Sequence, residues 1–95
     1  MATIDIRKTH TLTIDDAKKR AEQIATSMDQ KLDLEWHWEQ DRIVFAATRG
    51  MARGTRGSVD VSASDVRVQI DLPLLLRMMK GTVEAKVTEQ LTQIL

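Results

Sequence analysis

The 95-residue chain has no cysteine and no tyrosine, a single proline and only three aromatic side chains. Without cysteine there is no disulfide framework, no thiolate nucleophile and no thiolate metal site. The longest apolar stretch, Leu72 to Leu76, is far shorter than the roughly 18 residues that a membrane-spanning helix needs. The first residues do not show the basic and then apolar pattern of a secretory signal. The length of the chain predicts one domain, residues 1–95. The absences predict a location in the cytoplasm and no membrane span.

Neither sign of charge is in excess, because 14 basic and 14 acidic residues leave a net charge of zero. The distribution is uneven, since residues 42–58 contain four arginines and no acid. A domain without net positive charge exerts little long-range attraction on nucleic acid, so nucleic acid is not the expected partner. The basic segment is a local feature.

Hydrophobic periodicity predicts the order strand, helix, four strands, helix. We expect a strand over residues 3–12 and a helix over residues 14–31 with Thr13 as its N-cap. From Leu72 onward apolar residues recur at steps of three and four, which predicts a C-terminal helix with a kink or new start near Gly81. Its buried face would include Leu72, Leu76 and Met79. Because the strands are apolar on one side only, the fold class is α+β (β-α-β-β-β-β-α), an antiparallel sheet with two helices packed on one face.

Two hairpins are expected within the four consecutive strands. A two-residue turn at residues 40–41 would pair Trp36 with Phe45 and would place the large apolar side chains on one face. A turn at residues 64–65 would pair Val61 with Val68, and residue 59 with residue 70. Residues 48–57 hold three of the four glycines and are expected to form a loop or a bulged strand end.

No set of residues has the composition and spacing of a catalytic, cofactor or metal site. His10 and His37 lack a zinc-binding spacing such as HExxH and are expected to be unrelated surface imidazoles. The acids lie at a helix start, at exposed strand positions and in turns, without the hydrophobic or like-charge setting of catalytic carboxylates. We therefore expect a protein that is not an enzyme and that has no catalytic residue, metal or cofactor.

The segment from Thr48 to Gly57 contains three Arg-Gly dipeptides, at Arg49, Arg53 and Arg56. Guanidinium groups on a flexible backbone can bind phosphate or carboxylate, so these three residues are candidate anion contacts. The segment has neither the aromatic residues of single-strand readers nor the order of a P-loop. The alternative is a solvated connection in which glycine allows positive φ and arginine keeps the surface soluble.

Five of the six residues from Leu74 to Met79 are apolar, whereas one helix face can bury only about half of such a stretch. Leu74, Leu75, Met78 and Met79 are therefore the candidate contact residues for a partner or polymer, including a second copy of the chain in a homodimer. The alternative is that the first helix and the sheet cover them. We expect this region to be at least partly exposed.

The three aromatic residues, Trp36, Trp38 and Phe45, are expected to lie on the apolar face of the first hairpin. They would form part of the core. The alternative is that they line a small apolar pocket between the sheet and the C-terminal helix.

Four features together resemble the polyhydroxyalkanoic acid system protein family: the start Ile4 to Leu12, the alanine-rich first helix, the strand Leu34 to Glu39, and the run from Leu74 to Gly81 into a closing helix. In that family the genes lie with polyhydroxyalkanoate synthesis and granule genes in bacteria, and no catalytic residues are known. The family tends to have glycine where Gln40 stands and a shorter, less basic loop around residues 49–57. The element order also resembles a reduced helix-grip fold, in which a C-terminal helix covers a curved sheet; such a likeness does not imply a function.

The resemblance and the apolar surplus lead to three hypotheses. The first is a non-enzymatic accessory or binding protein of polyhydroxyalkanoate metabolism that contacts the granule surface or granule proteins. The second is a carrier of small apolar ligands such as hydroxyacyl chains or lipids. The third, which the zero net charge disfavours, is anion or nucleic-acid binding through the arginine-rich segment.

Overall fold

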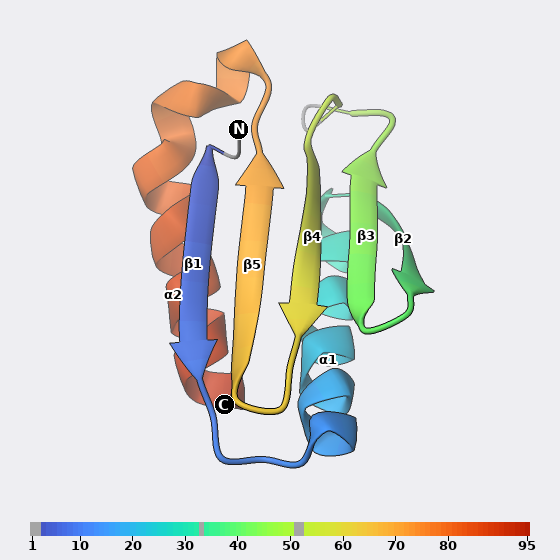
Figure 1. Ribbon diagram of the computed structural model, residues 1–95. Helices are drawn as coiled ribbons and strands as arrows, with labels where there is room; N and C mark the ends of the chain where they lie inside the picture. Colours follow the sequence, from blue (N-terminus) through green and yellow to red (C-terminus); the bar gives the residue numbers. More distant parts are fainter. Residues whose placement is uncertain (1–2, 33, 51–52) are drawn as a thin grey trace.

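The computed structural model of the chain describes residues 3–32, 34–50 and 53–95, apart from the side chains of Met28, Leu75 and residues 30–32. Its elements follow the expected order (Figure 1). They are β1 (Ile4–Thr9), α1 (Ile14–Leu32), β2 (Leu34–Glu39), β3 (Arg42–Ala47), β4 (Arg56–Val61), β5 (Asp65–Asp71), the 3₁₀ helix η1 (Leu74–Met79) and α2 (Lys80–Ile94). The five strands form one antiparallel sheet in the order β1-β5-β4-β3-β2. The predicted α+β class is therefore confirmed.

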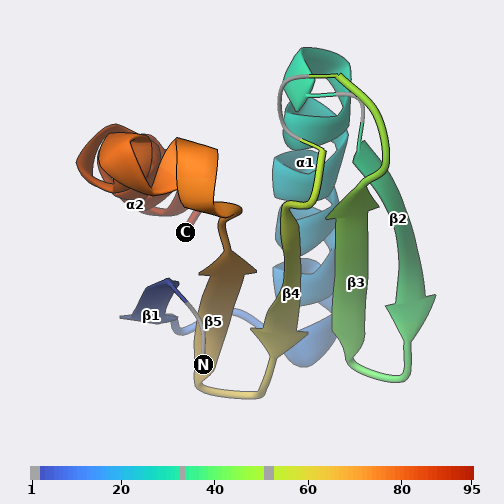
Figure 2. The ribbon, with the colours of Figure 1, turned by 90° about the horizontal axis from the view of Figure 1, so that it is seen from above.

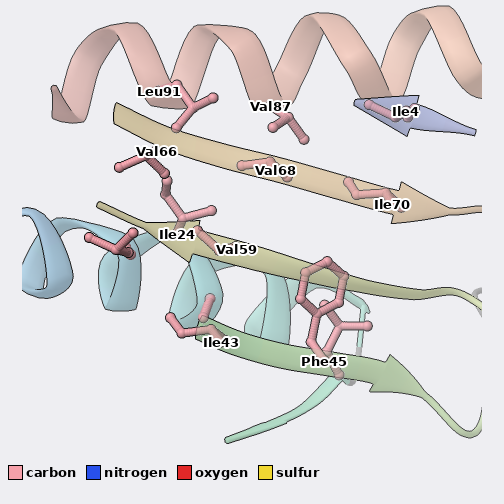
Figure 3. Close-up of a cluster of buried hydrophobic side chains, with 14 of the residues drawn as sticks. Ile4, Ile24, Ile43, Phe45, Val59, Val66, Val68, Ile70, Val87 and Leu91 are labelled. Atoms are coloured by element: carbon pink, nitrogen blue, oxygen red, sulfur yellow. The ribbon is translucent and has the colours of Figure 1, made fainter. Parts of the chain in front are cut away.

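Both helices cover the same face of the sheet, as Figures 1 and 2 show. Helix α1 packs on β2, β3 and β4, whereas α2 packs on β1, so each helix covers one half of the sheet. The strands alternate buried and solvent-facing residues, which is the pattern of a sheet with one covered face. Figure 3 shows the resulting core, in which Val87 and Leu91 of α2 and Ile24 of α1 point toward strand side chains such as Val59 and Val68.

Helix α1 begins where its N-cap was expected. The backbone N–H of Asp16 donates to Thr13 Oγ1 at 3.2 Å, and Asp15 and Asp16 place negative charge in the first turn. Among its described side chains the buried ones are small except for Ile24, and the alanines at 17, 21 and 25 let the helix axis lie close to the sheet. Strand β1, expected to reach residue 12, ends at Thr9.

The first hairpin has the predicted register, with Trp36 opposite Phe45 and Trp38 opposite Ile43. The second hairpin does not: Val61 pairs with Val66 rather than Val68, and position 59 pairs with position 68 rather than 70. The turn comes earlier because Ser62 closes it. Its hydroxyl oxygen accepts the N–H groups of Ser64 (3.2 Å) and Asp65 (3.0 Å) and donates to the Asp65 carboxylate (2.8 Å). A shift of two residues leaves every side chain on its original face of the sheet, so the alternation of apolar and polar residues could not distinguish the two registers.

Two further boundaries differ from expectation. Gly57 was placed in a loop or bulge, but it lies inside β4, opposite Phe45 on the core face. The C-terminal helix was expected to start near Leu72, yet the chain first forms the 3₁₀ turn η1 and becomes α-helical at Lys80. Leu72 is buried before the turn and Leu76 packs against the core, whereas Met79 is half exposed because the change in helical period rotates it off the buried face.

Candidate interaction surface

The described large apolar side chains that are most exposed all lie on η1, which we call the apolar turn (Leu74–Met79). Leu74 is 77% exposed, Met78 94% and Met79 50%. These are three of the four residues expected to contact a partner; the side chain of the fourth, Leu75, lies outside the described part of the structure. The expectation that the region is at least partly exposed is therefore met by the three described members.

The apolar turn is held against the end of β5 by polar contacts. Pro73 precedes it in an extended conformation, and the N–H of Leu76 donates to the Pro73 carbonyl at 2.9 Å. The guanidinium Nε of Arg77 donates to the Leu72 carbonyl at 3.2 Å, which ties the middle of the turn back to the strand end. Thr3 adds a link, since its hydroxyl oxygen accepts the N–H of Leu72 at 3.2 Å. These bonds hold the turn in place without burying its outward side chains.

The second feature is the arginine loop, residues 48–55, which connects β3 to β4. The N–H of Ala47 donates to the Thr55 carbonyl at 2.8 Å, and the N–H of Gly54 donates to the Ala47 carbonyl at 3.0 Å, so the base of the loop is closed. Gly50 and Gly54 have φ values of 76° and 94°, which only glycine adopts at little cost. The loop conformation therefore needs its glycines.

Arg49, Arg53 and Arg56 are all exposed. Arg49 and Arg53 belong to the arginine loop, while Arg56 is the first residue of β4. The ion pairs found among the described residues involve none of the three.

The arginine loop and the apolar turn lie at the same end of the sheet, where β3 leads into the loop and β5 leads into η1 (Figure 1). The loop comes close to the start of the turn: a β-carbon placed on Gly54 would lie 3.4 Å from Cβ of Pro73, the residue immediately before the apolar turn. Arg56 also stands opposite Asp71 in the β4–β5 ladder. The two segments that the sequence singled out separately thus form one surface.

Two further cations at this end, Arg77 and Lys80, were not singled out from the sequence. Both are exposed, and both lie in a stretch of the sequence, residues 72–83, that contains no acid. The absence of acids over these twelve positions could have indicated a basic surface from the sequence. It becomes informative only when the fold places this stretch at the same end of the sheet as the arginine loop.

The uncovered face of the sheet carries charges that neutralise one another. Arg67 donates two hydrogen bonds to the Asp5 carboxylate, at 2.9 and 2.6 Å, and Arg42 pairs with Asp60 across β3 and β4. The hydrogen bond from Arg67 holds the pKa of Asp5 below its usual value, and the positive charges of Arg67 and Arg7 act in the same direction. Such paired charges leave little net field, so this face is a weaker candidate for charge recognition than the arginine loop.

The three aromatic residues lie at different depths. Phe45 is 2% exposed and packs in the core against Gly57, whereas Trp36 and Trp38 are half-buried at the edge strand β2. The indole N–H of Trp38 donates to Glu22 of α1 at 2.6 Å, which fixes the ring. All three pack with the hydrophobic core, as the first of the two interpretations expected.

A shallow polar depression lies at the β2–β3 turn. It is lined by Glu39, Gln40, Asp41, Arg42, Asp60 and Val61. Lys18 pairs with Asp41 and Arg42 with Asp60, so its charges are already compensated by neighbours. None of the three aromatic residues lines it.

The histidines do not converge. His37 is exposed beside Glu39, with Nε2 2.9 Å from the carboxylate. His10 is a structural residue, because its Nδ1 accepts the N–H of Leu12 at 3.1 Å and its Nε2 lies 2.9 Å from the Ser62 carbonyl, joining the end of β1 to the β4–β5 turn.

In the described part of the chain no three His, Asp or Glu side chains are grouped so that they could hold a metal ion. Within the same residues, no helix has both the length and the apolar character to cross a membrane.

Comparison of the chain with curated proteins and with solved structures gives no significant match. A family model does match, over residues 4–95, which is almost the whole chain. The match includes β1, both hairpins, the apolar turn and α2. The chain therefore belongs to the family described as "putative polyhydroxyalkanoic acid system protein".

Proposed function

We propose that this protein is a non-catalytic accessory component of the polyhydroxyalkanoate system that contacts the granule surface through the apolar turn. One observation carries the proposal: Leu74 and Met78 are 77% and 94% exposed on a turn that is hydrogen-bonded to the end of the sheet. Burying a leucine or methionine side chain gains roughly 1.5–3 kcal/mol, so a surface that covers both would gain several kcal/mol. Family membership supplies the setting.

Co-sedimentation with polyhydroxyalkanoate particles tests the proposal. We expect wild-type protein to sediment with the particles and the double variant Leu74→Glu/Met78→Glu to remain in the supernatant. The matched control is Gln23→Glu/Thr26→Glu, which adds the same two charges at exposed positions of α1 and should bind as wild type does. Equal sedimentation of all three proteins, or of none, would refute contact through the apolar turn.

A second copy of the chain is the other partner that could cover these side chains. Analytical ultracentrifugation of wild type and Leu74→Glu/Met78→Glu distinguishes the two partners. We expect both proteins to be monomeric at micromolar concentration. A dimer that only the wild type forms would assign the apolar turn to self-association instead.

The carrier hypothesis depends on Trp36 and Trp38, the half-buried aromatic residues at the sheet edge. Because the Trp38 indole is hydrogen-bonded to Glu22, a ligand that enters beside it should shift tryptophan emission. We expect 3-hydroxyacyl chains of increasing length to leave the emission unchanged. A saturable shift that grows with chain length would favour the carrier function over granule contact.

A further inference from the structure

Positive charge without accompanying acids is concentrated in two segments of the chain. Residues 43–59 and 72–83 contain five cations, Arg49, Arg53, Arg56, Arg77 and Lys80, and no acid. Since the chain as a whole has 14 bases and 14 acids, these two segments carry +5 and the other residues carry −5. The ion pairs of the described structure include none of the five, whereas Arg7, Lys18, Arg42 and Arg67 pair with acids elsewhere.

The fold brings the two acid-free segments together. Gly54 of the arginine loop lies near Pro73, the residue immediately before the apolar turn, because a β-carbon on Gly54 would come within 3.4 Å of the proline ring. Arg49 and Arg53 therefore belong to the same end of the sheet as Leu74 and Met78, and Lys80 follows the turn directly. The most exposed apolar side chains among the described residues thus share one end of the sheet with four cations that take part in no ion pair among these residues: Arg49, Arg53, Arg77 and Lys80.

This combination indicates the chemistry of the surface that would cover it. A neutral polymer would bury Leu74 and Met78 but would give the cations no partner. A nucleic acid would bind the cations but would leave the leucine and methionine in water. Proteins that bind single strands also normally use aromatic stacking, and the three aromatic residues of this chain pack with the core instead. An anionic lipid surface matches both, since apolar side chains enter the acyl boundary while arginine and lysine bind the headgroups.

We propose that this end of the molecule docks on an anionic lipid surface, with Leu74 and Met78 entering the apolar boundary and Arg49, Arg53 and Lys80 binding anionic headgroups. The inference rests on the proposed function, because it uses the same apolar turn. It adds the class of surface and assigns a role to the arginine loop, which polymer contact alone does not need.

Vesicle sedimentation tests the inference with two compositions, phosphatidylcholine alone and an equimolar mixture with phosphatidylglycerol. We expect wild-type protein to bind the mixed vesicles and not the neutral ones, and to dissociate from them in 0.5 M salt because the headgroup contacts are screened. The variant Arg49→Gln/Arg53→Gln should bind the mixed vesicles about ten-fold more weakly, since each basic residue near an anionic surface contributes about five-fold or less. Leu74→Ser/Met78→Ser should also lose binding.

The matched control is Lys19→Gln/Lys86→Gln, which lowers the net charge by the same two units at exposed positions on the two helices. It should bind as wild type does, and tryptophan emission should show that all variants are folded. Equal binding to neutral and anionic vesicles, or equal weakening by the control, would overturn the inference. Lipid-free polyhydroxyalkanoate particles are sedimented in parallel. Binding to these particles without binding to either vesicle would overturn the inference and leave the proposed function standing, whereas binding to neither would refute both.

Discussion

Gly57 is the position at which the structure predicts the sharpest response to a small change. It lies on the core face of β4, opposite Phe45 of β3 and beside the backbone of β5. A β-carbon at this position would lie 2.4 Å from the Gln69 carbonyl oxygen, 2.5 Å from Phe45 Cζ and 2.8 Å from Phe45 Cε2. The Phe45 ring therefore occupies the space that a side chain at position 57 would need.

Neither neighbour can yield easily when Gly57 is replaced by alanine. The Gln69 carbonyl belongs to the β4–β5 ladder, and Phe45 is 2% exposed within the close-packed core. Overpacking of this kind costs about 1–3 kcal/mol, and occasionally more when backbone must shift. The intrinsic advantage of alanine over glycine in a strand, about 0.5–1 kcal/mol, offsets only part of this cost. We expect Gly57→Ala to lower the free energy of unfolding by about 1–2 kcal/mol.

Urea denaturation followed by the emission of Trp36 and Trp38 measures this change. Gly81→Ala is the matched control: no atom lies within 4 Å of the added β-carbon, and the residue is inside α2, so this variant should be up to about 1 kcal/mol more stable than wild type. Phe45→Leu should cost less in the Gly57→Ala background than in wild type, because it relieves the contact with the ring. If the free energy of unfolding of Gly57→Ala lies within about 0.5 kcal/mol of the wild-type value, the close packing of Phe45 on Gly57 is refuted.

Three further predictions concern a turn, a buried hydroxyl and an ion pair. Gln40 has a φ of 59°, so Gln40→Gly should raise the free energy of unfolding by about 1 kcal/mol in the same urea assay, whereas Asp41→Gly should not. Thr55 is 4% exposed and its hydroxyl has no hydrogen-bond partner among the described residues. Thr55→Val should therefore increase the stability by about 1 kcal/mol, which would appear as a higher thermal midpoint. A lower midpoint would show that the hydroxyl is hydrogen-bonded. The pKa of Asp5 is lowered in the folded state by its hydrogen bond with Arg67, so its contribution to stability is complete above the unfolded-state pKa and is lost as pH falls through the lower folded-state pKa. The stability difference between wild type and Asp5→Asn should therefore be greatest near pH 7 and should shrink below about pH 4; a difference that does not change with pH would contradict this assignment.

The two hairpins show where sequence reasoning succeeds and where it stops. In the first hairpin, pairing Trp36 with Phe45 also places Glu39 opposite Arg42, so the apolar face and the charged face agree on one register. In the second, Val59, Val61 and the valines of β5 give similar apolar pairs in registers two residues apart. The choice depends on the Ser62 hydroxyl bonds, which form only once the turn exists. Equivalent residues leave the register undetermined until turn geometry selects it.

The sequence by itself determined the element order, the covered face of each strand, the N-cap at Thr13 and the surplus of apolar side chains on the apolar turn. These properties follow from local periodicity and from single-residue preferences, which act over a few positions. Only the tertiary structure decided that Gly57 must be a glycine and that the arginine loop lies near Pro73. Those facts depend on contacts between strands and loops that are distant along the chain, and they exist only after the strands have paired. The same contacts join the two acid-free segments into one apolar and cationic surface.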